Sequence, residues 1–449
     1  MSSSINETHD PGLRSWVESA HSPGTDFPIQ NLPFGVFRRR NGVEPACVGI
    51  AIGNHIFDLT ACRHAGFFEG AAERAAAACA ADSLNALTSL GREYWAALRL
   101  RVSRLLRRDC PELAGKPGLA RSLLIPMEDA EMLLPALIGD YTDFYASIYH
   151  ASKVGKIFRP DNPLLPNYKW VPIGYHGRAS SILASGSAIR RPAGQIYDGQ
   201  SERPGFAPSR LLDYELEAGF LVGDGNLLGC PIPIDEAGKH IFGLCLVNDW
   251  SARDIQRWEY QPLGPFLSKS FATSISPWIV TMEALEPYRT TAFKRPESDP
   301  EPLPYLFSRS DAERGGFDLC LEVFLSSRRM REEGIEPVWL SRSNLKDLYW
   351  TAAQMVAHHT SNGCNLHSCD LLASGTVSGP GKESAGCLLE LTLNGTQPVA
   401  LPDGESRTFL QDGDEVIFRG YCERPGYARI GFGECRGTVL PAVLPERAP

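Results

Sequence analysis

The sequence predicts a mainly β protein with some helix, of the α+β class. Short apolar runs recur along most of the chain, and 42 glycines and 34 prolines separate them. Helical spacing marks one long stretch, residues 68–108, and the strand-like runs that follow do not alternate regularly with helices. This sequence pattern is typical of β-sandwiches and β-barrels rather than of βαβ units.

The N-terminal part is predicted to begin with a small antiparallel barrel or sheet. Residues 33–37 and 46–52 are short apolar runs with strand character. Gly53-Asn54 is a good hairpin turn, and the apolar run at 56–59 closes the hairpin.

A second domain is predicted after the helical stretch, where a new apolar run begins. We divide the chain into an N-terminal domain at 1–128, with a helical extension, and a larger domain at 129–449. Residues 343–359 are predicted to form a helix and 286–316 a long loop. Further strands are predicted at 240–247, 318–325, 388–393 and 415–420.

Composition excludes several classes of function. The 449 residues are 43% hydrophobic and 22% charged, with a net charge of −9 and no basic stripe, which argues against nucleic-acid binding. No run is long enough to span a bilayer, and the polar N-terminus lacks the apolar core of a signal peptide. We therefore expect a cytoplasmic protein with no membrane contact and reduced cysteines; there are twelve, none in a C-x-x-C pair.

The segment Gly139–His150 is the first candidate site. With Thr142 or Asp143 as N-cap, a helix from Asp143 would place Asp143, Ser147 and His150 on one face. The carboxylate suits a hard cation, and the imidazole suits a general base. The alternative is a capped helix whose aromatic residues face the core.

A second acidic pattern lies at Asp213, Glu215 and Glu217, which would project from one face of a strand. Such a row of like charges needs solvent, basic partners or a cation. The alternative is a solvated sheet face, but the apolar run that follows favours an interior strand.

The third candidate follows the apolar strand that ends at Asp249. In the helix after it, Arg253, Gln256 and Tyr260 share a face and would suit a carboxylate or a developing oxyanion. The alternative is an N-cap Asp and a surface face. Lys269 lies in small, apolar sequence, so it either extends to water or offsets a buried acidic cluster.

Two residues near the C-terminus complete the candidates. Thr376 lies in a glycine-flanked loop that looks exposed. Glu390 lies in an apolar run interpreted as a strand, where a carboxylate usually has a partner. His150 suits that part, because a His–Glu pair can activate water.

At this point the chain resembles the fumarylacetoacetase family, from Asp26 almost to the C-terminus. Members hydrolyse fumarylacetoacetate to fumarate and acetoacetate at the end of tyrosine and phenylalanine breakdown. The motifs that carry the resemblance are Gly139-Asp-Tyr-Thr-Asp-Phe-Tyr, Gly174-Tyr-His-Gly-Arg-Ala-Ser-Ser, Asp213-Tyr-Glu-Leu-Glu, Asn248-Asp-Trp-Ser-Ala-Arg-Asp-Ile-Gln and Leu372-Ala-Ser-Gly-Thr-Val-Ser-Gly-Pro.

The resemblance implies a role for each matching residue. The metal carboxylates would be Asp143, Glu215, Glu217 and Asp249. His150 would be the general base, oriented by Glu390. The oxyanion would be stabilised by Arg253, Gln256 and Lys269. The substrate would be held by Tyr145, Arg159, Tyr175, Gln256, Tyr260 and Thr376.

Cofactors, assembly and fold follow from the same resemblance. Ligation by oxygen alone favours Ca²⁺, Mg²⁺ or Mn²⁺. A second Mg²⁺ is expected near Asp249, Lys269 and Thr273, although Ser268 and Ala272 stand where the family commonly has glycine. Family members are homodimers with an SH3-like first domain and a sandwich-like or roll-like catalytic domain.

Two other functions fit parts of the pattern. One is a related acylpyruvate or β-diketone hydrolase, against which the N-terminal domain argues. The other is a catalytically silent metal-binding scaffold, which would not need His150 and Glu390 beside a carboxylate cluster.

Overall fold

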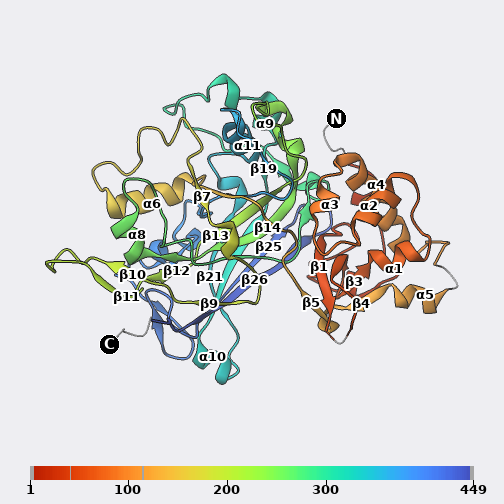
Figure 1. Cartoon of the computed structure of the whole chain (residues 1–449), viewed down its shortest axis with the longest axis horizontal. Coiled ribbons are helices and arrows are strands. Elements are labelled where there is room, and N and C mark those ends of the chain that lie inside the picture. The colour runs from red at the N-terminus through yellow and green to blue at the C-terminus, as the bar shows by residue number, and fades with distance from the viewer. Residues whose placement is uncertain (1–4, 41, 114–115, 445–449) are drawn as a thin grey trace.

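The computed structural model describes residues 5–40, 42–113 and 116–444, and it confirms the mixed α+β class. Three main sheets organise this part of the chain (Figure 1). One belongs to an N-terminal unit, drawn in red and orange, and the other two pack together in a larger unit. The described residues include no helix that is both long and apolar enough to cross a membrane.

The N-terminal unit is built on a five-stranded antiparallel sheet. Its strands, in spatial order, are β4 (Leu124–Pro126), β3 (His55–Asp58), β2 (Cys47–Ile52), β1 (Phe34–Arg39) and β5 (Ala130–Met132). The predicted hairpin is confirmed, with Gly53 at a positive φ of 57° between β2 and β3. Because β5 pairs with β1, the sheet continues past residue 128. The division at 128 and the SH3-like barrel both stay predictions.

Helices lie between β3 and β4, both within the stretch predicted at 68–108 and on either side of it. They are α1 (Leu59–His64), α2 (Gly70–Ala78), α3 (Asn85–Thr88), α4 (Arg92–Leu106) and α5 (Pro117–Ser122). The buried face of α4 carries Trp95, Leu98 and Val102, spaced at three and four residues as an amphipathic helix requires.

The largest sheet is mixed and lies at the centre of the molecule. Its strands, in order, are β7 (Gly174–Gly177), β6 (Tyr141–Phe144), β22 (Leu371–Ala373), β13 (Leu216–Val222), β14 (Ile241–Asp249), β16 (Thr273–Ile275) and β8 (Ile182–Ala184), with β17 (Val280–Thr281) also paired to β14. Every residue of β14 is buried, which confirms the strand predicted at 240–247.

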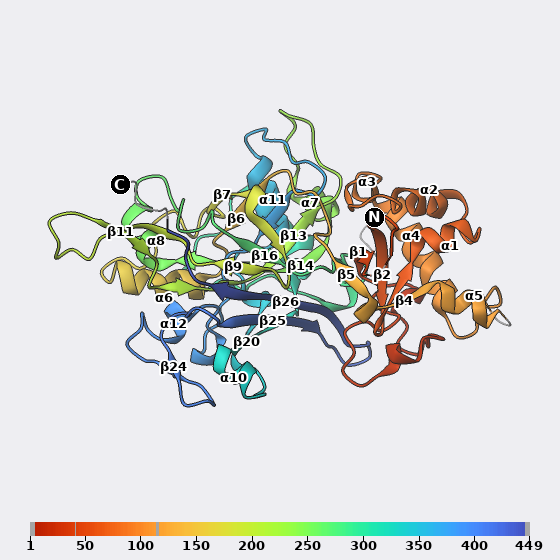
Figure 2. The same cartoon turned by 60° about the horizontal axis from the view of Figure 1, so that its bottom comes forward.

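Alternation along β14 explains why both faces of this sheet are covered. Leu244 and Leu246 join the core shared with the third sheet, whereas Cys245 and Val247 join the core shared with the N-terminal unit. The third sheet lies beneath β13 and β14 in Figure 2. Its strands are β21 (Val338–Asn344), β20 (Cys320–Ser326), β25 (Glu415–Cys422), β26 (Ile430–Leu440) and β9 (Ala188–Arg190).

The contact between the units is apolar and closely packed. The ring of Phe242 lies 5.0 Å from that of Trp95 in an edge-to-face pair and 5.7 Å from that of Phe34. A Cβ added to Gly223 would stand 2.2 Å from Trp95, so that position requires glycine. The N-terminal unit therefore covers one apolar face of the large sheet.

Short elements complete the larger unit. The helices are α6 (Ile148–Phe158), α7 (Ile234–Ala237), α8 (Arg253–Glu259), α9 (Arg309–Arg314), α10 (Arg328–Glu332), α11 (Ala352–Thr360) and α12 (Leu388–Leu391). The two-stranded pairs are β10 (Ala193–Ile196) with β11 (Gly205–Pro208), β12 (Leu212–Asp213) with β15 (Ser251–Ala252), β18 (Arg289–Thr290) with β19 (Gly316–Phe317), and β23 (Val399–Ala400) with β24 (Ser406–Arg407).

Three predictions of local structure need correction. The helix expected at 343–359 is shorter, because Asn344 ends β21 and a capping box at Thr351 begins α11. The loop expected at 286–316 contains α9, which Ser308 caps.

The run at 388–393 is not a strand. It begins with α12, because the Asp213 carboxylate accepts hydrogen bonds from the first two backbone N–H groups of that helix, those of Leu388 and Leu389. A short apolar run fits a buried strand and a buried helix equally well, so the sequence alone did not separate them.

Candidate active site

A cavity of about 490 Å³ opens at the end of the large sheet. Many of the predicted site residues line it, although they come from distant parts of the chain. They are Asp143, Tyr145, His150, Arg159, Tyr175, Glu215, Arg253, Gln256, Tyr260 and Lys269. The other predicted site residues do not line the cavity: Glu217, Asp249, Thr273, Thr376 and Glu390.

Four buried carboxylates meet at one side of the cavity. Asp143 lies on β6, Glu217 on β13, Asp249 at the end of β14, and Glu215 just before β13. Ligand oxygens from the four residues all lie within 4.8 Å of one another. Strand order explains this convergence, because β6, β22, β13 and β14 are successive neighbours in the sheet.

The expected helix from Asp143 is wrong in one respect. Asp143 lies within strand β6, which ends at Phe144, and Ser147 is the N-cap of α6, accepting a hydrogen bond from the backbone N–H of His150. Tyr141–Phe144 pairs with β7 and β22, which fixes it as a strand despite its helical spacing. Asp143 and His150 thus reach the cavity from successive elements rather than from one helix face.

Internal cations balance part of the cluster. Lys269 donates to Glu215 at 2.7 Å and to Asp249 at 2.8 Å, and Arg253 donates to Glu215 at 2.5 Å. Burial alone would raise the pKa of Glu215, but Lys269 and Arg253 outweigh it and hold that pKa well below its ordinary value. Thr273 and Tyr175 also donate to Asp249, at 3.0 and 2.8 Å.

The rest of the cluster lacks such compensation. Burial, followed by the charge of Asp249, raises the pKa of Asp143 well above its ordinary value. Burial, followed by the charges of Asp143 and Asp249, does the same to the pKa of Glu217. Both carboxyl oxygens of Glu217 are buried without a hydrogen-bond partner.

These features fit a divalent metal site. All donors are carboxylate oxygens, which hard cations such as Ca²⁺, Mg²⁺ and Mn²⁺ prefer. The ammonium of Lys269 has no lone pair, so its side chain balances charge here and cannot act as a ligand while protonated. The second cation expected at Asp249, Lys269 and Thr273 stays a prediction.

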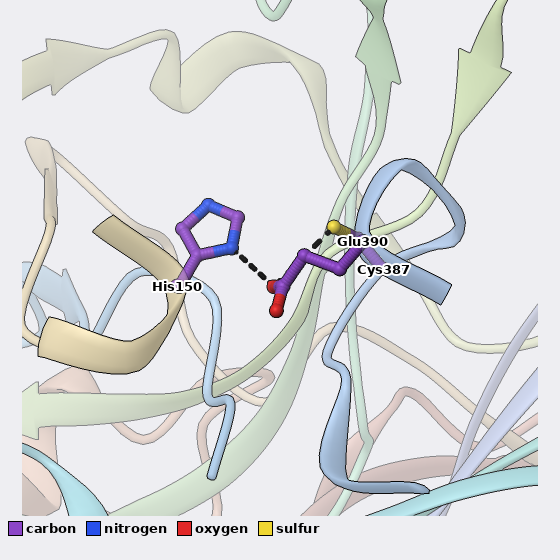
Figure 3. A group of neighbouring side chains, drawn as sticks. All are labelled: His150, Cys387 and Glu390. Carbon is purple, nitrogen blue, oxygen red and sulfur yellow. Dashed lines mark hydrogen bonds and ion pairs between the residues drawn. The ribbon is translucent and has the colours of Figure 1, made fainter. Parts of the chain in front are cut away.

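His150 and Glu390 form a buried pair beside this cluster (Figure 3). His150 Nδ1 lies 2.5 Å from Glu390 Oε1. The same oxygen accepts a hydrogen bond from Ser378 Oγ at 2.6 Å and lies 3.6 Å from the thiol of Cys387. Burial tends to raise the pKa of Glu390, but His150, Lys153 and Ser378 together hold it below its ordinary value.

This contact selects one form of the neutral imidazole. A carboxylate can only accept, so Nδ1 of His150 carries the hydrogen and the other ring nitrogen is left with a free lone pair. Figure 3 shows that nitrogen pointing away from Glu390. The arrangement suits a general base, since the carboxylate fixes the tautomer and stabilises the imidazolium.

Arg253 links the acidic cluster to the cavity wall. It contacts Asp213 at 2.9 Å, and it donates to the side-chain oxygen of Gln256 at 3.2 Å. With its oxygen so used, Gln256 has its NH₂ group free to donate. Asp213 was expected to project beside Glu215 and Glu217, but the strand is interrupted between β12 and β13, so Asp213 turns toward Arg253 and α12.

Of the residues expected to hold the substrate, five line the cavity and one is buried away from it. Tyr145, Arg159, Tyr175, Gln256 and Tyr260 line the cavity. Thr376, expected in an exposed loop, is only 2% exposed.

The physical reason for the burial of Thr376 lies in its neighbour. Gly375 has a positive φ of 72° and packs against the backbone of Phe144 and Tyr145, where a Cβ would stand 2.1 Å from the carbonyl oxygen of Phe144. The substrate role of Thr376 stays a prediction.

Several residues of the site were not found in the sequence. Apolar side chains that line the cavity include Phe158, Leu164 and Leu263. Ser378 donates to Glu390 from a loop segment, and no local sequence pattern signals that contact. Lys153 had a weak signal, because it lies three residues after His150 on α6 and so shares its side of the helix.

Comparisons with protein families agree along most of the chain. Residues 141–440 match the family described as "Fumarylacetoacetate (FAA) hydrolase C-terminal". Residues 30–135 match the family described as "Fumarylacetoacetase N-terminal".

Curated proteins similar to the chain include fumarylacetoacetases from Oryza sativa subsp. japonica and Homo sapiens. The first is 50% identical over 434 residues, which cover 96% of this chain and 98% of the relative. The second is 49% identical over 424 residues, which cover 94% and 98%.

A solved structure of a fumarylacetoacetate hydrolase from Exiguobacterium antarcticum is similar in fold. Its TM-score is 0.50 at 17% identity, over 91% of this chain and 99% of the other.

Proposed function

The chain belongs to the fumarylacetoacetase family, hydrolases of carbon–carbon bonds, and we propose that it hydrolyses fumarylacetoacetate to fumarate and acetoacetate. The bond cleaved joins the fumaryl carbonyl carbon to the neighbouring carbon of the acetoacetate part. One observation carries the chemical proposal: the 2.5 Å contact between His150 and Glu390 lies beside a buried four-carboxylate cluster at one cavity.

In this proposal His150 is the general base. Its unprotonated ring nitrogen takes a proton from water, and the hydroxide adds to the fumaryl carbonyl carbon. The carbon–carbon bond then breaks, and the acetoacetate part leaves with the electron pair as an enolate. The imidazolium returns its proton to that carbon, so one water is consumed for each bond broken.

Asp143, Glu215, Glu217 and Asp249 are proposed to hold a divalent cation, and Ca²⁺, Mg²⁺ and Mn²⁺ all suit their oxygens. When bound, such a cation polarises the diketo oxygens as a Lewis acid. The support is the set of buried carboxylates, in which Glu217 offers two oxygens without hydrogen-bond partners. A second cation, Mg²⁺, is proposed near Asp249, Lys269 and Thr273, where Lys269 balances charge rather than acting as a ligand.

Donors on the cavity wall are proposed to stabilise the alkoxide formed by hydroxide addition. Gln256 offers its NH₂ group, and Arg253 and Lys269 supply positive charge from behind. Loss of one oxyanion donor typically costs about 2.7–4 kcal/mol of transition-state stabilisation. Substrate contacts are assigned to Tyr145, Arg159, Tyr175, Gln256, Tyr260 and Thr376.

The proposal is tested by adding purified protein and Ca²⁺ or Mg²⁺ to fumarylacetoacetate. We expect the ultraviolet absorbance of the diketone to disappear and fumarate to form in equal amounts. An acylpyruvate measured in parallel should be the poorer substrate by kcat/KM. Hydrolysis of the acylpyruvate alone would favour the related hydrolase, and inactivity on both would favour a silent scaffold.

Assembly and location are proposed on separate grounds. We infer a homodimer, as the family resemblance implies, through an apolar surface beside the cavity. Its exposed side chains are Phe206, Trp258, Leu263, Phe266 and Leu267. Light scattering should give twice the chain mass, and Leu263→Asp should reduce it. A cytoplasmic location is supported by the twelve cysteines, all free thiols.

A further inference from the structure

Lys153 lies one turn after His150 on α6 and has no part in the mechanism above. Its ammonium nitrogen is 3.3 Å from Glu390 Oε2, the carboxyl oxygen that does not contact His150. It also donates to the carbonyl oxygens of Gly379 at 3.1 Å and Gly381 at 3.2 Å. Lys153 thus donates hydrogen bonds to two backbone carbonyls, and its charge faces Glu390 Oε2, a buried oxygen that has no hydrogen-bond donor among the described residues.

These contacts tie together the segments that hold the dyad. The loop segment 378–381 carries Ser378, whose hydroxyl donates to Glu390 and whose carbonyl accepts a hydrogen bond from Ser147, the N-cap of α6, at 2.9 Å. Helix α6 therefore contacts this segment on both sides of His150, at Ser147 and at Lys153. Movement of α6 relative to this segment would break both contacts.

The charges around Glu390 also indicate that Lys153 supports the dyad. The side chain of Glu390 is 0% exposed, and an ionised carboxylate in such a place needs a partner of opposite charge. While His150 is neutral, the dyad carries one negative charge, and Lys153 is the cation in contact with it. Lys153 itself is 31% exposed, so its ammonium remains partly hydrated.

We propose that Lys153 is a positioning residue for the general base, holding Glu390 ionised and aligned with His150 Nδ1. Lys153 is not among the residues that line the cavity, so it acts through Glu390 and not on the substrate. This inference rests on the proposed function, and it adds a counter-ion that supports the base while the imidazole is neutral.

The experiment compares Lys153→Met with Lys156→Met, an exposed lysine one turn further along α6. With fumarylacetoacetate and saturating Ca²⁺, Lys153→Met should lower kcat by about 10- to 100-fold, as loss of a group that orients a catalytic residue typically does. KM and Ca²⁺ affinity should stay within about twofold, because neither ligand touches Lys153. Lys156→Met should match the unaltered protein, and Lys153→Arg should recover most of kcat because it keeps the charge.

A double-mutant cycle with Glu390→Gln separates positioning from general loss of structure. If Lys153 acts through Glu390, adding Lys153→Met to Glu390→Gln should lower kcat by less than about threefold more. Three outcomes would each overturn the proposal. They are an undiminished kcat in Lys153→Met, equal losses of kcat in Lys153→Met and Lys153→Arg, and a full additional loss of kcat when Lys153→Met is added to Glu390→Gln.

The two proposals fail differently. Absence of hydrolysis by the unaltered protein would remove the proposed function and the Lys153 inference together. Normal hydrolysis by both the unaltered protein and Lys153→Met would remove the Lys153 inference alone. Thermal unfolding of each variant shows whether a loss of activity reflects misfolding.

Discussion

A single buried carboxylate, Glu390, and a cluster of four buried carboxylates lie near one cavity, and their charges are balanced in opposite ways. Glu390 is contacted by His150, Ser378 and Lys153, and these groups hold its pKa below the ordinary value. Asp143 and Glu217 face other carboxylates, and burial together with those charges raises their pKa values. The dyad is electrostatically complete within the chain, whereas the cluster needs positive charge from outside. Burial alone therefore does not decide how an acid behaves.

The largest expected effect comes from breaking the dyad. His150→Asn should lower kcat by about 10²- to 10⁴-fold, the usual contribution of a general base. Its cation affinity should stay unchanged, because the four ligand carboxylates remain. Turnover and Ca²⁺ titration calorimetry on the same preparation check both parts, and near-normal turnover would remove His150 from the role of base.

In the four-carboxylate cluster, a substitution should weaken cation binding, which the substitution at His150 leaves unchanged. Glu217→Gln removes one of four charges around the ion and should weaken Ca²⁺ binding by about 100-fold. Activity should fall at limiting Ca²⁺ and return in part when the ion is raised. Glu390→Gln is the matched control, because it makes the same change of group in the dyad and should leave Ca²⁺ affinity intact. Equal Ca²⁺ affinity in the two variants would contradict this contrast.

The contributions of Glu217 and Glu390 to folding stability should depend on pH with opposite signs. A folded pKa above the ordinary value favours the folded state at low pH, so the contribution of Glu217 is lost as pH rises from about 4.5 through its raised pKa. Glu390 has a lowered pKa, so its contribution is present above about pH 4.5 and is lost as pH falls.

We expect Tm of the chelator-treated protein to fall with rising pH more steeply than Tm of the Ca²⁺-loaded protein. Glu217→Gln should reduce that difference in slope, and Glu390→Gln should not. Differential scanning calorimetry across the pH range measures both slopes. Parallel curves with and without Ca²⁺ would mean that the cluster is already balanced without an ion.

The smallest effect is expected at Cys387. Its thiol lies 3.6 Å from Glu390 Oε1, and a thiol is a weak donor beside the hydroxyl and imidazole that bind the same oxygen. Cys387→Ser should change kcat by less than about twofold. A steady-state assay checks this, with Ser378→Ala as the comparison expected to lose more. A large loss in Cys387→Ser would show that the dyad depends on the thiol.

The sequence predicted the site better than some of the elements that carry it. β14 was found because the apolar run that ends in Asp249 was interpreted as a strand, although such a run fits a buried helix equally well. Glu390 was paired with His150 because a charge in an apolar run needs a partner, whether that run is a strand or a helix. Its secondary structure was missed because the Asp213 contact that begins α12 comes from far along the chain.

Long-range contacts also explain the secondary structure and the site residues that the sequence did not reveal. Asp143 lies in a run whose spacing suits a helix, and pairing with β22 makes it a strand. Ser378 and Lys153 act through partners on other segments, so their own neighbours in the sequence give little sign of a role.

The apolar contact around Trp95 and Phe242 has a consequence for biosynthesis. The ribosome releases the N-terminal unit first, before β13, β14 and β22 exist. Its apolar face stays uncovered until the strands of the large sheet have been synthesised. A nascent chain stalled before Phe242 would thus hold an open, adhesive surface, the kind of surface that chaperones bind.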